Sequence, residues 1–166
     1  DEAAGLIALF ADGSFRDAQG MLDQLVSLEE KEISGVEVRK VFGIPQRQLV
    51  ENFVSAILAK NAGAAFEIIG SLTEQNLDMK MFIKLVLRNL RHLLLLQLAP
   101  TMAKDLERAT TKTEFDFLLK NKPLAHSKNL ELMLASFIDA YDATGRSYLS
   151  QLPLELAVVK IVENLK

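Results

Sequence analysis

Apolar residues recur at intervals of three and four along almost the whole chain, and no stretch sustains the strict alternation of a half-buried strand. The first segment shows the pattern: Leu6, Ile7 and Phe10 fall on one face before the Asp12-Gly13 break. Apolar residues at this spacing form one face of an α-helix, which buries that face against other elements. We therefore predict an all-α fold made of packed helices.

Glycine, proline and serine divide the predicted helices into two groups. Ser14 and Ser34 are natural N-caps, so we expect short helices over 2–11, 15–28 and 35–42. The tripeptide Gly43-Ile44-Pro45 then interrupts the helical pattern, because glycine and proline both break helices. Longer helices are expected over 46–61, 63–75, 78–98, 113–121, 127–144 and from 152 to the end, where Pro153 suits a first turn. The expected organisation is a small three-helix bundle at 1–43 and a larger bundle at 46–166.

Composition narrows the classes of function. With 49% hydrophobic and 25% charged residues the 166-residue chain should fold, and its net charge of −3 provides no global basic field for nucleic acid. Cysteine is absent and no secretion signal is visible, which favours the cytoplasm. The chain starts at Asp1, inside a predicted helix and without an initiator methionine. We expect it to be a piece of a longer protein.

The longest predicted helix contains the run Leu93-Leu94-Leu95-Leu96, which raises the question of a membrane span. Lys84, Arg88, Arg91 and His92 interrupt the apolar run well short of the roughly 20 residues that a span needs. Burial within a helical bundle is the better interpretation, and we expect no membrane partner.

Candidate catalytic and metal-binding residues are few. His92 and His126 are the only histidines, and neither has a second histidine or a glutamate three or four residues away. We expect His92 to be partly buried beside Arg88 and Arg91, and His126 to lie in a loop or cap. The glycines fall at caps and turns and form no phosphate loop. The chain alone therefore predicts no catalytic residue, no metal site and no enzyme activity.

Arg16 stands out because it falls in the first turn of a capped helix. A cation at this end opposes the helix dipole by a few tenths of a kcal/mol, so local stability does not favour it. Taken alone, a solvated surface arginine is the simpler interpretation, and a functional role is the alternative.

The segment Gly13-Ser14-Phe15-Arg16-Asp17-Ala18, followed by Leu22-Asp23-Gln24, resembles the sensor-2 helix of the bacterial DNA polymerase III gamma/tau family. That family comprises AAA+ clamp-loader ATPases, and its pattern is Gly-Ser-x-Arg-Asp-Ala followed by Leu-Asp-Gln. Further similarities follow in the family's order: residues 33–43 to its third lid helix, Leu90-Arg91-His92-Leu93-Leu94 to its long collar helix, and Leu154-Glu155-Leu156-Ala157 to its last helix. The resemblance is strong over residues 11–43 and looser beyond them.

The resemblance implies an AAA+ lid domain at 1–43 and a clamp-loader collar at 46–166. In the family the sensor-2 arginine, here Arg16, reaches the γ-phosphate of ATP, and a guanidinium is well suited to bind phosphate oxygens. The implied partners are other clamp-loader subunits through the collar, and the sliding clamp and primed DNA through the full assembly. The family's phosphate loop, acidic Walker residues, zinc cysteines and arginine finger are missing here. ATP is thus the expected cofactor of a full-length parent, and we expect none to bind this piece.

Two other hypotheses remain open. One is a DNA-binding helix-turn-helix, in which Val36 to Phe42 and the turn at 43–45 precede a recognition helix opening with Gln46-Arg47-Gln48. Glu51 and the negative net charge argue against it. The other is a generic helical scaffold, for which the Gly-Ser-x-Arg-Asp-Ala motif would be a coincidence.

Overall fold

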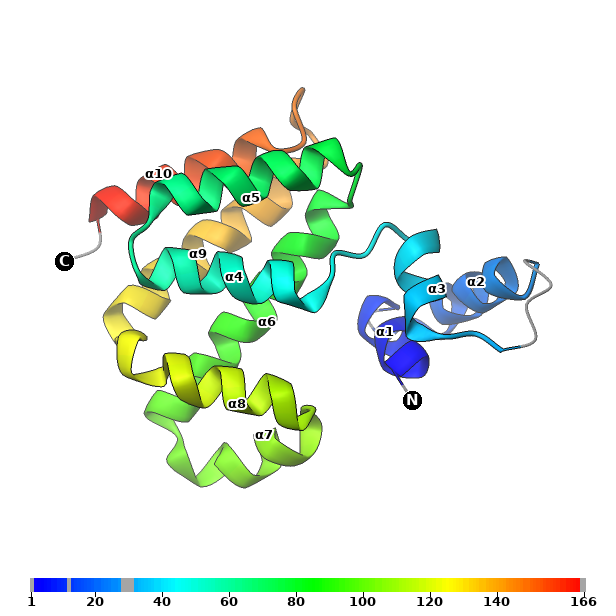
Figure 1. Cartoon of the computed structure of the whole chain (residues 1–166), viewed down its shortest axis with the longest axis horizontal. Coiled ribbons are helices and arrows are strands. Elements are labelled where there is room, and N and C mark those ends of the chain that lie inside the picture. Colours follow the sequence, from blue (N-terminus) through cyan, green and yellow to red (C-terminus); the bar gives the residue numbers. More distant parts are fainter. Residues whose placement is uncertain (1, 12, 28–31, 165–166) are drawn as a thin grey trace.

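The computed structural model describes residues 2–11, 13–27 and 32–164. Its α-helices are α1 (Glu2–Phe10), α2 (Phe15–Val26), α3 (Gly35–Val41), α4 (Arg47–Leu58), α5 (Ala62–Glu74), α6 (Met79–Leu98), α7 (Ala103–Ala109), α8 (Lys112–Asn121), α9 (Ser127–Thr144) and α10 (Leu152–Asn164) (Figure 1). Two short 3₁₀ turns, η1 (Pro100–Met102) and η2 (Lys122–Leu124), join neighbouring helices. No strand occurs in the described ranges, and the prediction of an all-α fold is confirmed.

Local capping explains where the early helices begin. The Ser14 side chain accepts a hydrogen bond from the Asp17 N–H at 3.2 Å, as predicted. Ser34 forms a full capping box: its hydroxyl accepts from the Glu37 N–H at 3.3 Å, and the Glu37 carboxylate accepts from the Ser34 N–H at 2.6 Å. The predicted stop at Asp12 and the predicted end of the second helix at Leu28 lie outside the described residues, as do the last two residues of the chain.

The region after α6 differs most from the sequence-based expectation. The sequence predicted no helix between 98 and 113, whereas the structure places η1 and α7 there. α7 has seven residues and buries only Leu106, so it is too short to show an apolar period. α8 also begins earlier than predicted, because Thr111 and Glu114 form a capping box before Lys112.

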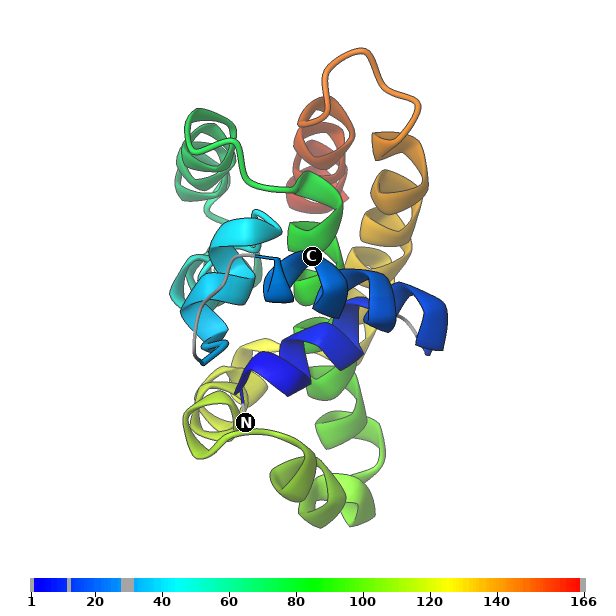
Figure 2. The ribbon, with the colours of Figure 1, turned by 90° about the vertical axis from the view of Figure 1, so that its right-hand side faces the viewer.

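Helices α1, α2 and α3 pack on one another at one end of the molecule, and α4 to α10 form the larger bundle (Figures 1 and 2). α3 ends at Val41 and α4 begins at Arg47, so no helix runs through the connection. Gly43 in this connection has a φ of 59°, which favours glycine, and its carbonyl accepts a hydrogen bond from the Asp78 N–H at 3.0 Å. The buried apolar residues nevertheless form one connected cluster. A division into two domains at 43–45 remains our proposal.

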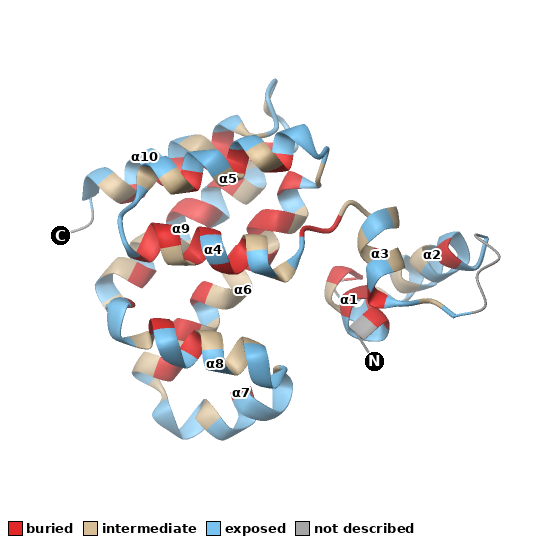
Figure 3. Cartoon of the chain, viewed as in Figure 1, coloured by how far each residue is buried: buried red, intermediate tan, exposed pale blue. Residues whose placement is uncertain are grey.

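The core of the larger bundle lies where α4, α6 and α9 meet, and α9 also packs along α10 (Figure 3). Phe53 is fully buried between two other phenylalanines: its ring centre lies 5.0 Å from that of Phe82, edge to face, and 5.9 Å from that of Phe137. In the leucine run, Leu93 and Leu96 are buried against this core, as the bundle interpretation predicted. Among the described helices, none combines the length and apolar character needed to cross a membrane.

Candidate functional site

Arg16 occupies the second position of α2, and its side chain is exposed. The Ser14 cap holds the start of this helix, and Phe15 beside Arg16 is 86% exposed. The Arg16 guanidinium therefore lies on the surface, where packing does not restrict its conformation. Whether it contacts a nucleotide phosphate stays a prediction.

The two histidines lie where the sequence placed them. His92 is half-buried on α6, and His126 is exposed at the N-cap of α9 without a side-chain capping bond. Burial, together with the nearby positive charges of Arg88 and Arg91, lowers the pKa of His92 to about 4. The described residues contain no group of three potential metal ligands.

The pH dependence of the free energy of unfolding should show that His92 is neutral in the folded chain. Between a pKa of about 4 in the folded chain and 6.5 in the unfolded chain, the unfolded state binds more protons. The free energy of unfolding should thus fall as the pH drops from 6.5 towards 4. In His92→Gln this contribution is absent, so urea unfolding at a series of pH values should show a shallower loss, most clearly above the pH at which carboxylates titrate.

The matched control for this measurement is His126→Gln, at the exposed N-cap of α9. This variant should keep the pH slope of the original chain. Equal slopes for His92→Gln and the original chain would contradict the assignment.

Arginines from four helices line a cleft of about 570 Å³ that the sequence analysis did not foresee. Its lining residues come from α1 and α3 on one side and from α4, α6, α7 and the start of α8 on the other. Figure 1 shows how these helices are arranged. Its polar lining consists of Arg39, Arg47, Arg88, Arg108, Thr110, Thr111, Thr113 and Glu114, and Leu6 and Leu9 of α1 form an apolar wall. We call it the arginine cleft. No spacing in the sequence connects these arginines, so only the packing of the helices brings them together.

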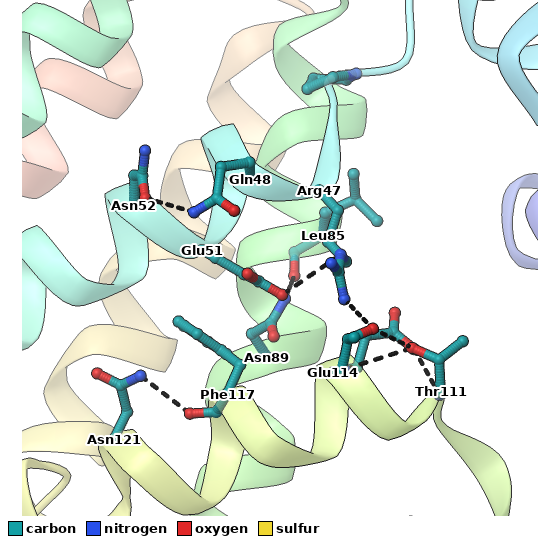
Figure 4. A network of polar contacts seen from close by, with 12 residues as sticks. Arg47, Gln48, Glu51, Asn52, Leu85, Asn89, Thr111, Glu114, Phe117 and Asn121 are labelled. Carbon is teal, nitrogen blue, oxygen red and sulfur yellow. Dashed lines mark hydrogen bonds and ion pairs between the residues drawn. The ribbon is translucent and has the colours of Figure 1, made fainter.

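A polar network links α4, α6 and α8 at the floor of the arginine cleft (Figure 4). Arg47 lies 3.6 Å from the Glu51 carboxylate and donates to the Thr113 hydroxyl, while Arg88 lies 3.9 Å from the Glu114 carboxylate. These two ion pairs are long, and the arginine side chains are 40% and 32% exposed, so each pair contributes little stability by itself. The network orients the arginines more than it stabilises the fold.

The Glu114 carboxylate belongs to the capping box at the start of α8. Burial pushes its pKa upward, but the Thr111 N–H and hydroxyl donate to it at 2.8 and 2.9 Å, and Arg88 and Arg47 add positive charge. Together these contacts outweigh burial and hold the pKa of Glu114 below its usual value. Glu114 thus carries its negative charge at neutral pH.

Glu51 lies behind Arg47 and is buried. Burial raises the pKa of this carboxyl, Arg47 partly offsets that effect, and the negative charge of Glu114 adds to it. Its Oε1 makes no hydrogen bond, although it lies within ion-pair distance of Arg47. The Glu51 carboxyl therefore contacts Arg47 but, being buried, does not line the cleft.

Several side chains at the start of α4 are engaged with other residues of the protein. Arg47 faces α8 through Thr113, and Glu51 is buried. The exposed side chains of α4 are Gln48 and Asn52, which hydrogen-bond to each other at 2.8 Å. This arrangement does not favour the helix-turn-helix hypothesis, because such helices read bases with several exposed residues.

No family model matches the chain. The tau subunit of DNA polymerase III from Bacillus subtilis (strain 168) is 25% identical over 158 residues, which cover 95% of this chain. The chain is similar to DNA polymerase III tau subunits. The gamma/tau subunit of Mycoplasma genitalium (strain ATCC 33530 / DSM 19775 / NCTC 10195 / G37) is 30% identical over 79 residues, or 47% of the chain. The resemblance predicted from the sequence to this kind of subunit is thereby confirmed.

The similarity to the DNA polymerase III subunits covers only part of them. The aligned region spans 28% of the Bacillus subtilis tau subunit and 13% of the Mycoplasma genitalium gamma/tau subunit. The activities of the whole subunits therefore apply to this chain only as proposals.

Proposed function

We propose that the chain is the lid and collar part of a clamp-loader subunit of bacterial DNA polymerase III, acting in DNA replication. Similarity to a tau subunit over 158 residues supports this proposal most strongly. Residues 1–43 act as the AAA+ lid, and residues 46–166 act as the collar that joins neighbouring subunits into a ring. The full-length subunit uses ATP, and its assembly loads the sliding clamp onto primed DNA.

Arg16 senses ATP in this proposal. Its guanidinium is exposed at the start of a capped helix, where it can reach the γ-phosphate of a nucleotide held by another domain of the parent protein. Arginine suits this role because its planar fork forms charge-assisted hydrogen bonds to phosphate oxygens. The lid can then close in response to the terminal phosphate.

The collar meets a neighbouring clamp-loader subunit through the outer face of α10. Leu152, Leu156 and Val159 follow one another at intervals of four and three, so they lie on one face of the helix, and they are 39%, 60% and 39% exposed. The opposite face of α10 is buried in the bundle through residues such as Leu154 and Ile161. An apolar stripe left exposed on an otherwise packed helix is typical of a protein interface.

The substitution Leu156→Lys in the full-length protein tests this role of the collar. An interface residue that fills a pocket costs more than about 1 kcal/mol when lost, so assembly with the other clamp-loader subunits should weaken by about fivefold or more. The fraction of assembled complex can be measured by sedimentation at several concentrations. Loading of the clamp should fall in parallel at limiting protein concentration.

Leu98→Lys is the matched control, because Leu98 is also a leucine, is 66% exposed and lies at the end of α6. Both substitutions are at the surface and should change the stability of the fold by no more than about 0.5 kcal/mol. If both variants assemble as the original protein does, α10 does not form the subunit contact.

A further inference from the structure

The arginine cleft concentrates positive charge in a chain whose net charge is −3. Arg39 comes from α3, Arg47 from α4, Arg88 from α6 and Arg108 from α7. Among the described residues that line the cleft, Glu114 is the single acidic one. Guanidinium groups repel one another at close range, so gathering four of them disfavours the fold unless an anion offsets the charge.

Two of these arginines, Arg47 and Arg88, keep donors for a ligand, while Arg39 also donates one terminal nitrogen to the Pro45 carbonyl at 2.8 Å. A guanidinium carries five N–H groups. Arg47 uses its Nε and one terminal nitrogen on Glu51 and Thr113, and Arg88 directs one terminal nitrogen to Glu114. Arg108 is exposed at the end of α7. The remaining N–H groups of Arg47 and Arg88, with Arg108, are able to bind an anion on the open side of the cleft.

The size of the cleft selects the kind of anion. Its volume of about 570 Å³ lies in the range of small-molecule sites and exceeds what a single phosphate ion fills. Arginines on four different helices match an elongated anion with several charged oxygens, since guanidinium N–H groups form charge-assisted hydrogen bonds to phosphate oxygens. On the side opposite Arg47, Arg88 and Arg108, the cleft is apolar at Leu6 and Leu9.

We propose that the arginine cleft binds a polyphosphate chain, either inorganic or carried by a nucleoside. The bound anion contacts α3 on one side and α4, α6 and α7 on the other. It therefore holds the first three helices against the larger bundle. This site is separate from Arg16, which lies on α2 outside the cleft, so it stands independently of the proposed sensing of ATP.

Titration of the 166-residue chain with inorganic tripolyphosphate at low ionic strength tests the proposal. Calorimetry should show saturable binding to one site, and amide NMR shifts should be confined to the residues that line the cleft, those around Arg39 on α3 and around Thr110 and Thr111 after α7 among them. Low salt is needed because mobile ions screen exposed charges. Binding weaker than about 1 mM, or shifts spread over the whole chain, would overturn the proposal.

Two arginine variants distinguish specific binding of tripolyphosphate in the cleft from nonspecific electrostatic attraction to the chain. Arg108→Gln removes an exposed cleft arginine and should weaken tripolyphosphate binding by about tenfold or more, as expected for loss of a hydrogen bond to a charged group. Arg146→Gln removes the same charge at an exposed position outside the cleft and should leave binding unchanged. Equal weakening by both variants would show that the chain attracts the anion without a specific site.

Arg88→Lys supplies a second variant that keeps the charge and loses the planar fork. It should weaken binding while leaving the melting temperature without ligand close to that of the original chain, because the ion pair to Glu114 is long. Unchanged tripolyphosphate binding by Arg88→Lys would contradict a two-pronged contact between the Arg88 guanidinium and the phosphate oxygens.

A parallel titration with ATP identifies the source of the phosphates. Affinity equal to that for tripolyphosphate points to a free polyphosphate, and tighter binding of ATP points to a nucleotide.

Discussion

The substitution Phe53→Ala should lower the free energy of unfolding by about 3–5 kcal/mol, the usual cost of removing a fully buried phenylalanine side chain. Phe53 has no exposed surface, and its ring packs at 5.0 Å from that of Phe82 on α6 and at 5.9 Å from that of Phe137 on α9. Its loss leaves a cavity where three helices meet, and close packing on every side prevents the neighbours from filling it. Urea unfolding followed by circular dichroism measures the change.

Phe15→Ala is the matched control for this prediction. It removes the same side chain from the first position of α2, where Phe15 is 86% exposed, and should change stability by no more than about 0.5 kcal/mol. Similar losses for the two variants would mean that Phe53 does not lie at the centre of the cooperative core.

In the full-length protein, Arg16→Ala should reduce ATP-driven clamp loading by at least about tenfold. In the proposed role of Arg16, the change removes a charge-assisted contact to the terminal phosphate, and such contacts are worth on the order of 1.5–3 kcal/mol. Arg16→Lys should restore only part of the rate, because an ammonium keeps the charge but cannot form the planar two-pronged contact. A loading assay on primed DNA with saturating ATP measures both variants.

Stability is the control for Arg16. Since its side chain is exposed, the melting temperature of the 166-residue chain should be nearly the same with and without the substitution. A full-length Arg16→Ala protein that loads clamps at the original rate would show that the motif is only a well-capped helix. This result would leave the proposal for the arginine cleft unaffected, because Arg16 does not line it.

Much of the secondary structure could be predicted because it depends on residues close together in the chain. Ser14 caps α2 through a residue three positions later, and Ser34 does the same for α3 through Glu37. Apolar residues three and four apart likewise form the buried face of each long helix. The short α7 was missed because a helix that buries one leucine leaves no period to detect.

The position of Arg16 was predictable because the Ser14 cap defines the first turn of α2. The partial burial of His92 was predictable because the residue lies within a largely apolar helix. The arginine cleft was not. Arg39, Arg47, Arg88 and Arg108 belong to four helices, and their meeting depends on how those helices pack. The sequence by itself determined where the longer helices lie and which face each one buries, because hydrogen bonds and side-chain contacts within a helix reach only three or four residues. Only the tertiary structure decided which charged side chains share one cleft, because contacts between distant segments arise from packing of the whole core.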